Sequence, residues 1–378
     1  MMSAVRLIRL GTAFLFAVAA QQITHPEFVV AQQAKVEKVE WRDLDLTDER
    51  LVVTGAPFSE RAESGIVFRR FSSETLKAGK AELNFDPRKA QTTTGVVLHL
   101  ATDSPSVQLR FEVQDGENRG SELGVFQIGK YVEGVRFGRA KQTIELTIES
   151  VTPNKRTDFE ISLPSWSNPK LTRISVHSRS KLLDPNVPQR VYVALGDSIS
   201  HGTGQGSATY RTWPFLLSRR LKMSLHSVAV GGGKISPRAA EQVAKLARVD
   251  LVTILVGYND WNSAINPVAF GKQYRQALMT LVRSHPNARI VCITPTFTTR
   301  TESARSSHKL DEFRQAVREA VTSLDRGGQV VVFEGTELSS KKNLRPEGTD
   351  DVHFSETGAR LFAAALSKRL ERSGVGSE

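Results

Sequence analysis

Four short segments in the C-terminal half of the sequence carry the side-chain types that acyl transfer requires. Ser198 lies in VALGDSISHGTG, Asn259 in VGYND and His353 in GTDDVHF, and a run of glycines lies in AVGGGK. A serine hydroxyl becomes an effective nucleophile when a histidine accepts its proton, and the anionic tetrahedral intermediate needs fixed hydrogen-bond donors. Together these segments predict a serine hydrolase site.

The predicted catalytic residues are Ser198, His353 and Asp350. Ser198 follows an apolar run, where serine is also a common helix N-cap, and its role as nucleophile depends on the other motifs. His353 would be the base, with a carboxylate orienting its other ring nitrogen. Asp350 precedes the histidine by three residues, so one turn brings both side chains together, while Asp351 is the competing carboxylate.

Three groups are candidate donors to the oxyanion of the intermediate. They are the backbone N–H groups of Ser198 and Gly232 and the side-chain amide of Asn259. Because Gly231, Gly232 and Gly233 are consecutive, the sequence leaves the register of the glycine donor open.

Side chains beside these motifs are candidates for binding the substrate. Tyr258 and Trp261 flank the candidate amide, and an aromatic face suits the apolar face of a sugar ring. His201, close after the serine, would line the pocket, although it also competes with the DDVH histidine as a base. Trp213 lies in a helical pattern and is expected in the core, and Asp197 is expected to accept hydrogen bonds within its loop.

The elements that must position these residues alternate from residue 191 onward. Continuous apolar runs, typical of parallel strands covered on both faces, occur at VYVAL, HSVAV, LVTILVG, ARIVCIT and QVVVFEG. Helical segments lie between them, including TWPFLLSRRLK, SPRAAEQVAKLA, PVAFGKQYRQALMTLVRSH and KLDEFRQAVREAVTSL. The alternation predicts a three-layer α/β/α domain with a parallel sheet, residues 191–378. Ligands bind beyond the carboxyl ends of such strands, which is where the four motifs fall.

In the preceding region, residues 36–180, the apolar residues recur with a different period. Apolar residues alternate in VQLRFEV, IELTI and FEISL, so that Val107, Leu109 and Phe111 share one face. Short strands separated by Gly, Pro, Asn and Asp predict a β-sandwich of jelly-roll type with no helix. A polar, proline-bearing connector, residues 181–190, would join the two domains.

The N-terminal segment, residues 1–31, has the layout of a secretory signal peptide. Arg6 and Arg9 precede a short apolar stretch that ends in small residues. Three cleavage positions fit this layout, after Ala19, Ala20 or Ala31. The mature protein would then be secreted or periplasmic, with no stable membrane span, and an uncleaved membrane anchor is the alternative.

Composition excludes several classes of protein. The formal net charge is +11, yet the basic residues are scattered and form no nucleic-acid-binding motif. A solvated basic surface explains this charge, and an acidic polysaccharide is the first partner to test if the charge matters. Cys292 is the single cysteine, so no intramolecular disulfide is possible, and it lies in an expected core strand. No metal-ligand spacing or dinucleotide fingerprint occurs, so no metal or other cofactor is expected.

The segments GDSIS, GYND and DDVH and the glycine after the second strand resemble the four blocks of the SGNH, or GDSL-type, hydrolases in order and spacing. The resemblance covers nearly all of the sequence from residue 191 to the end. It implies the catalytic roles given above, with Gly232 as the second oxyanion donor after Ser198. The family often has Asn-x-Gly-x-x-Gly around the second block. In this sequence Ser227 replaces the Asn and Ala229 replaces the first Gly.

A narrower resemblance concerns both halves of the chain. TWPFLLSRRL, SHPNARIVCITPT and ISLPSWSNPKLTRISV are similar to two-domain bacterial SGNH esterases with an N-terminal jelly roll, a group that includes carbohydrate acetylesterases. This implies an exported esterase that removes short acyl groups, chiefly acetyl, from a carbohydrate or other small ester. The alternatives are a lipid esterase or lysophospholipase, an acyltransferase with the same triad, and a non-catalytic polysaccharide-binding protein.

Overall fold

The structure of the protein is a computed structural model that describes residues 39–114, 119, 121–138, 143–263, 265–324 and 328–374. The predicted signal peptide and its three cleavage positions lie outside the described residues. Within the described part of the chain, no helix is both long and apolar enough to cross a membrane.

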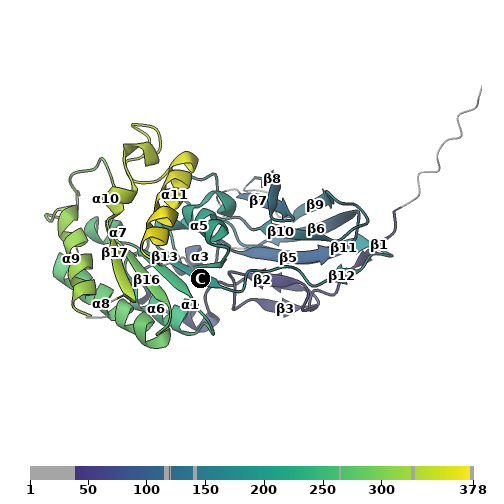
Figure 1. Ribbon diagram of the computed structural model, residues 1–378, viewed down its shortest axis with the longest axis horizontal. Coiled ribbons are helices and arrows are strands. Elements are labelled where there is room, and N and C mark those ends of the chain that lie inside the picture. The colour runs from purple at the N-terminus through teal and green to yellow at the C-terminus, as the bar shows by residue number, and fades with distance from the viewer. Residues whose placement is uncertain are drawn as a thin grey trace, which may run out of the picture. The chain divides into compact units, whose positions relative to one another are not determined.

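The alternating segments of the N-terminal half form two antiparallel sheets of six strands each (Figure 1). The first contains, in spatial order, β3 (Glu60–Ala62), β4 (Gly65–Val67), β11 (Pro169–His177), β6 (Ser106–Val113) and β9 (Thr143–Glu149), with β1 (Trp41–Asp43) paired to β11. The second contains β12 (Leu182–Leu183), β5 (Val97–Thr102), β10 (Thr157–Ser162), β7 (Ser121–Gln127) and β8 (Lys130–Phe137), with β2 (Val52–Thr54) paired to β5. Val107, Leu109 and Phe111 are buried together in one apolar core, as their spacing predicts. The prediction of an N-terminal β-sandwich is confirmed.

Three short helices occur among the described residues of this half, and the expectation that it contains no helix is wrong. They are α1 (Ser73–Lys77), α2 (Lys80–Leu83) and α3 (Pro87–Ala90). Each is shorter than the window in which a helical period can be recognised. Their signals are local caps instead: the Ser72 side chain accepts from the Thr75 N–H, and the Asp86 side chain accepts from the Arg88 N–H, with Pro87 in the first turn.

The C-terminal half is built on a five-stranded sheet in which every neighbouring pair is parallel. Its order is β14 (Ser224–Ser227), β13 (Val191–Gly196), β15 (Leu251–Leu255), β16 (Arg289–Ile293) and β17 (Val330–Phe333). The sheet is buried, and Cys292 lies inside it as a fully buried core residue.

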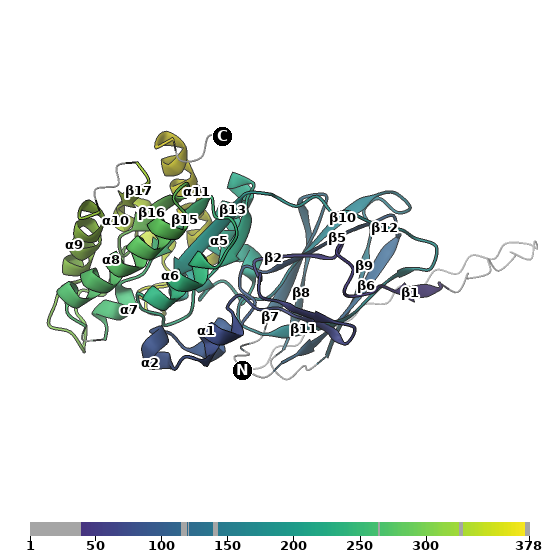
Figure 2. The same cartoon turned by 90° about the horizontal axis from the view of Figure 1, so that it is seen from below.

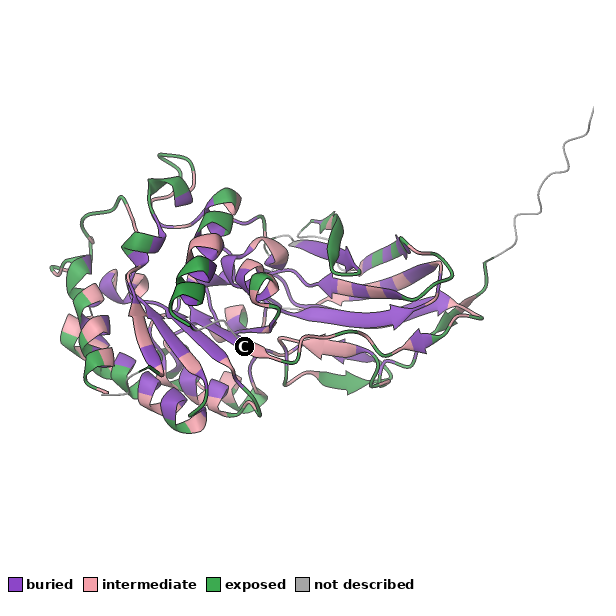
Figure 3. Ribbon diagram, in the orientation of Figure 1, coloured by how far each residue is buried: buried purple, intermediate pink, exposed green. Residues whose placement is uncertain are grey.

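Helices cover both faces of the parallel sheet. One apolar core joins the sheet to α6 (Pro237–Ala244), α8 (Pro267–Ser284) and α9 (Leu310–Thr322). Another joins its opposite face to α5 (Trp213–Leu221) and α11 (Glu356–Arg372). Figure 2 shows α6 and α8 side by side, and Figure 3 shows buried strands beneath helices that expose one side. The three-layer α/β/α prediction is confirmed.

Five short elements lie between the longer ones. They are α4 (Ser198–His201), α7 (Tyr258–Trp261), α10 (Gly335–Leu338) and the 3₁₀ helices η1 (Thr209–Arg211) and η2 (Lys341–Asn343). α4 and α7 begin just after the carboxyl ends of β13 and β15. They are the elements that carry Ser198 and Asn259.

The two halves share buried contacts within residues 40–378, which form one compact unit. Phe71 and Phe85 of the β-rich half join the core under α6 and α8, and Phe126 of β7 joins the core under α5. The connector at 181–190 contributes β12 to the second antiparallel sheet. The boundary at residue 190 between two separately folding domains remains a prediction.

Candidate active site

Ser198 is the first residue of α4, directly beyond the carboxyl end of β13. Asp197 caps this helix, because its Oδ1 accepts from the Ile199 N–H at 2.9 Å. The expected role of Asp197 within its loop is thereby confirmed. Burial raises the pKa of Asp197 to about 7, although the hydrogen bond from Ile199 acts in the opposite direction. A residue with a Cβ would not fit at Gly196, since that atom would lie 2.3 Å from Ser200 Oγ.

The His353 ring lies between Ser198 and Asp350. Its Nε2 is 2.8 Å from Ser198 Oγ, and its Nδ1 is 2.7 Å from Asp350 Oδ2. The turn is held by Asp350 Oδ1, which accepts from the N–H groups of Val352 and His353 at 3.0 Å each. Burial acts to raise the pKa of Asp350, but these N–H donors and the nearby His353 ring hold it below its ordinary value. The carboxylate therefore stays ionised and faces the imidazole.

Asp351 has different neighbours. Its Oδ1 accepts from Thr299 Oγ1 at 2.7 Å, and its Oδ2 lies 4.0 Å from the Arg300 guanidinium. The side chain is 48% exposed, against 14% for Asp350. The geometry thus brings Asp350, and not Asp351, to the histidine.

The glycine run has one N–H group in position to meet a ligand. Gly231 N–H donates to His201 Nδ1 at 2.9 Å, and Gly233 N–H donates to Val230 O at 2.8 Å. Gly232 is exposed with a φ of +76°, and no hydrogen bond from its N–H is seen among the described residues. The hydrogen bonds therefore favour Gly232 as the oxyanion donor, a choice that the sequence alone left open.

Asn259 lies in the first turn of α7, close to the same loop. Its Nδ2 donates to Gly233 O at 3.0 Å and lies 3.4 Å from Asp197 Oδ2. The loop is anchored beneath it by the buried Asp260, which accepts from Ile235 N–H at 3.1 Å. Burial raises the pKa of Asp260 to about 7. The amide of Asn259, the glycine loop and the start of α4 are thus tied into one network.

The two aromatic candidates for sugar stacking differ in exposure. Trp261 is fully buried in the core under α8, and its Nε1 donates to His308 O at 2.8 Å. Its proposed role in binding substrate is therefore wrong, because no face of the ring is open. Tyr258 is only partly buried and packs edge-to-face on Trp261, with ring centroids 5.4 Å apart. Trp213 is fully buried against Phe362, so its expected place in the core is confirmed.

His201 does not line a pocket, and that expectation is also wrong. The residue is fully buried. Its Nε2 lies 2.7 Å from Ser165 O and 3.0 Å from Thr92 Oγ1, while its Nδ1 accepts from Gly231. Both ring nitrogens are thus engaged within the protein, so His201 serves neither as a base nor as a substrate contact.

Residues of the β-rich half reach the glycine loop, and sequence reasoning missed the two that lie beside Gly231 and Gly232. Lys89 Nζ lies 3.9 Å from the point that a Cβ on Gly232 would occupy. Trp166 stands so close to Gly231 that a Cβ there would lie 2.3 Å from its Cη2 atom. Only the glycine run signalled such contacts, because three residues without side chains in succession suggest close approach by other groups.

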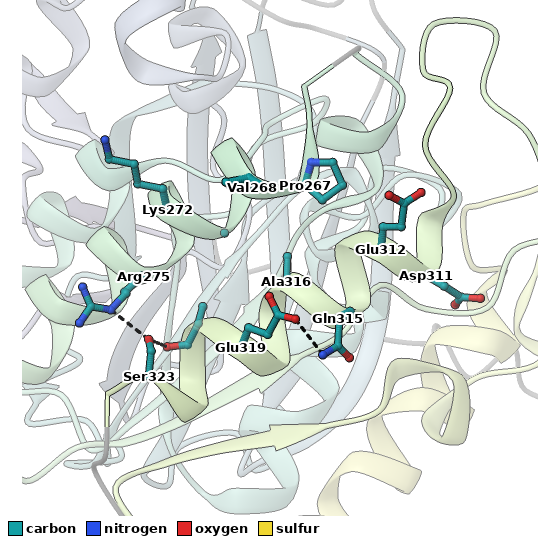
Figure 4. A pocket seen from close by; sticks show the side chains of 12 residues that line it. Pro267, Val268, Lys272, Arg275, Asp311, Glu312, Gln315, Ala316, Glu319 and Ser323 are labelled. Atoms are coloured by element: carbon teal, nitrogen blue, oxygen red, sulfur yellow. Dashed lines mark hydrogen bonds between the residues drawn. The ribbon is translucent and has the colours of Figure 1, made fainter.

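One cavity lies away from these residues. It is a groove of about 690 Å³ between α8 and α9, whose lining includes Val268, Lys272, Arg275 and Glu319 (Figure 4). None of the predicted catalytic residues lines it. In the described ranges, no group of three or more His, Cys, Asp and Glu side chains is arranged to hold a metal ion.

Comparison with known proteins gives one family and a set of similar folds. Residues 194–361 match the model of the GDSL-like lipase/acylhydrolase family. A salicylyl-acyltransferase from a tetracycline biosynthetic pathway superposes with a TM-score of 0.78 at 22% identity, covering 88% of this chain and 98% of that one. The comparison with curated proteins gave no match.

Two carbohydrate esterases share the architecture. A family two carbohydrate esterase from Cellvibrio japonicus has a TM-score of 0.64 at 16% identity, covering 89% of this chain and 98% of its own. An acetyl xylan esterase from Butyrivibrio proteoclasticus has a TM-score of 0.63 at 11% identity, covering 88% and 99%. The likeness includes the β-rich half, since residues 191–378 alone could not give this coverage.

Proposed function

We propose that the protein removes short acyl groups, chiefly acetyl, from carbohydrates. The proposal proceeds from the premise that the chain is an ester-hydrolysing enzyme with a domain of the GDSL-like lipase/acylhydrolase family at residues 194–361. The observation that carries the proposal is the unbroken contact from Asp350 through His353 to Ser198, at 2.7 and 2.8 Å. In this arrangement a histidine can accept the proton of an alcohol while a carboxylate stabilises the resulting imidazolium.

In the proposed reaction, Ser198 Oγ attacks the ester carbonyl carbon as its proton passes to His353 Nε2. The negative charge that forms on the carbonyl oxygen is met by the N–H groups of Ser198 and Gly232 and by the Asn259 amide. As the bond to the sugar oxygen breaks, His353 gives its proton to that oxygen, so that the sugar leaves with a free hydroxyl and the acyl group stays on the serine. A water molecule, deprotonated by the same histidine, attacks this acyl-enzyme. The histidine then returns that proton to Ser198 Oγ as the bond to the acyl group breaks and the acid is released.

The proposed carbohydrate is acidic. Lys and Arg number 51 against 40 for Asp and Glu, and Lys89 places one of these charges beside the exposed Gly232. The backbone of Lys89 is fixed, because its carbonyl accepts from Thr92 Oγ1 at 2.8 Å and from Arg70 at 3.4 Å. An ammonium group near the glycine loop suits a uronic acid residue next to the acylated sugar.

A second candidate function is acyl transfer to an acceptor other than water. It is favoured by the likeness in fold to the salicylyl-acyltransferase, whose TM-score is 0.78. The same acyl-enzyme serves both reactions, and the species that attacks it decides the outcome. Product analysis with alcohol acceptors in the assay therefore distinguishes transfer from hydrolysis.

Substrate panels test the proposed function. We expect release of acetate from acetylated polygalacturonate and acetylated xylan, and faster hydrolysis of p-nitrophenyl acetate than of p-nitrophenyl octanoate. Preference for the long-chain ester would contradict the proposal and favour a lipid esterase. Lys89→Gln should reduce kcat/KM on the acidic glycan by about tenfold and leave xylan unaffected. Lys272→Gln, in the groove between α8 and α9, is the matched control.

We propose that the enzyme is exported and acts outside the cytoplasm. The sequence pattern of residues 1–31 supports this proposal. N-terminal sequencing of protein recovered from the medium or the periplasm tests it. A first residue directly after Ala19, Ala20 or Ala31 is expected, and protein retained in the membrane with residue 1 intact would contradict export in soluble form.

A further inference from the structure

We infer that His201 and Trp166 are positioning residues that hold the Gly232 N–H in place as an oxyanion donor. Trp166 belongs to the segment between β10 and β11, so the β-sandwich half takes part in building the active site. The inference rests on the proposed function in one respect, because it takes Gly232 as a donor to the reacting oxygen.

The hydrogen bonds of His201 fix its protonation and its direction. Because Nδ1 accepts from Gly231 N–H at 2.9 Å, the proton of the neutral ring is on Nε2. That N–H donates to Ser165 O at 2.7 Å and lies 3.0 Å from Thr92 Oγ1. Burial, followed by the charge of Arg70, lowers the pKa of His201 well below its ordinary value. The ring therefore stays neutral and keeps its Nδ1 lone pair on the glycine loop.

Trp166 fixes the same glycine from another side. Its ring stacks on His201 with centroids 4.0 Å apart and an interplanar angle of 7°. Its Cη2 atom would lie only 2.3 Å from a Cβ on Gly231, so only a glycine allows the indole this close to the backbone. The Arg119 guanidinium lies 4.0 Å from the indole centroid, and Trp166 is 3% exposed. The indole thus has little room to move.

These contacts restrain the peptide that carries the Gly232 N–H. This N–H belongs to the peptide between Gly231 and Gly232, and Gly231 is held by its own N–H and by the indole against its Cα. On the other side, the Gly233 N–H closes a turn onto Val230 O. A run of glycines has much conformational freedom, so an oxyanion donor placed there needs such restraints to be preorganised.

A further contact anchors the strand that leads to the loop. Arg70, fully buried in the β-rich half, donates to Ser227 O at 2.7 Å and to Ala229 O at 3.0 Å. Its Nε donates to Thr92 O at 2.6 Å. The Arg70 side chain thus links two segments. One contains Thr92, which contacts His201 Nε2, and the other leads from Ser227 into the glycines.

The test compares two substitutions of His201. Asn can keep a carbonyl acceptor near the place of Nδ1, whereas Leu removes it. With p-nitrophenyl acetate, His201→Leu should lower kcat by about tenfold to a hundredfold with KM changed less than about threefold, and His201→Asn should regain part of the loss. Rates are counted per serine that reacts with a fluorophosphonate, so that misfolded protein does not contribute. His99→Leu, which removes another buried histidine from the β-sandwich, is the control and should keep kcat near the wild-type value.

A second variant covers the case in which His201→Leu does not fold. Trp166→Phe retains an aromatic ring on His201 but withdraws the atoms that touch Gly231, and it should lower kcat by about threefold to tenfold at unchanged KM. The pH profile of kcat/KM should stay as in the wild type, since neither residue exchanges a proton. Unchanged kcat in the folded variants, a change confined to KM, or a shifted pH profile would overturn the inference. The activity of the wild-type protein on p-nitrophenyl acetate tests the proposed esterase function separately from this inference.

Discussion

His353 Nε2 lies 2.8 Å from Ser198 Oγ, although 155 positions separate the two residues in the chain. The parallel sheet makes this possible, because Ser198 follows β13 and His353 follows β17, and both strands end at the same edge. The contact joins the alcohol and the base that the proposed reaction requires.

The two neighbouring aspartates should respond differently to loss of charge. Asp350→Asn should lower kcat/KM by about a thousandfold or more, because the amide cannot stabilise the imidazolium and favours the wrong tautomer. Asp351→Asn should change it by less than about threefold, since its carboxylate contacts Thr299 and Arg300. Both are measured on p-nitrophenyl acetate at one pH, with folding checked by circular dichroism. The reverse order of effects would exchange the roles of the two residues.

Loss of the Asn259 amide should affect the transition state more than substrate binding. Asn259→Ala should reduce kcat by about a hundredfold with a smaller change in KM, because the amide meets a full negative charge only in the tetrahedral intermediate. Asn262→Ala removes an amide at the end of the same helix and serves as the control. A change in KM alone would instead make Asn259 a residue for substrate binding.

A methyl group on Gly232 should disturb the oxyanion donor through the backbone. Gly232 has a φ of +76°, which costs a residue with a Cβ about 1 kcal/mol. Gly374 has a φ of +66° with no atom near its Cβ position, so Gly374→Ala introduces comparable strain away from the site. Both variants should lose similar stability, but only Gly232→Ala should lose kcat, by about tenfold or more. Equal activity of the two would exclude Gly232 as a donor.

Stability should fall as the pH rises toward neutrality, in part because of Asp260. Burial raises its folded-state pKa to about 7, above the value in an unfolded chain. The folded state therefore binds the proton more tightly, and the stability from this group is present at low pH and is lost as the pH passes through about 7. Asp260→Asn should show a smaller loss of unfolding free energy between about pH 5 and about pH 8 than the wild type. The exposed Asp311→Asn is the control, and an unchanged pH slope in Asp260→Asn would contradict the burial argument.

Much of the fold follows from hydrophobic period. Alternation in the first half and continuous apolar runs in the second predict two antiparallel sheets and one parallel sheet, as observed. The ordered motifs also predict which loops meet, because strand ends in a parallel sheet share one edge. The short helices α1 to α3 could not be predicted from period, since each is about one turn long.

The burial and contacts of each site residue are harder to predict from the sequence than the loop on which the residue lies. Trp261 and His201 are adjacent in sequence to the motifs, yet both are fully buried, Trp261 in the core under α8 and His201 against Trp166. Lys89 lies 143 residues before Gly232 and Trp166 lies 65 residues before Gly231, and the glycine run was the only local signal of such contacts. They depend on packing between the two halves of the chain.

The turnover of p-nitrophenyl acetate by Ser198→Ala tests most directly whether Ser198 is the nucleophile. The substitution removes the hydroxyl that His353 contacts and leaves the remaining hydrogen bonds of the site in place. We expect a fall in kcat of about a thousandfold or more in a variant whose circular dichroism matches the wild type. Near-normal turnover by the folded Ser198→Ala protein would contradict the claim that this enzyme works through an acyl group on Ser198.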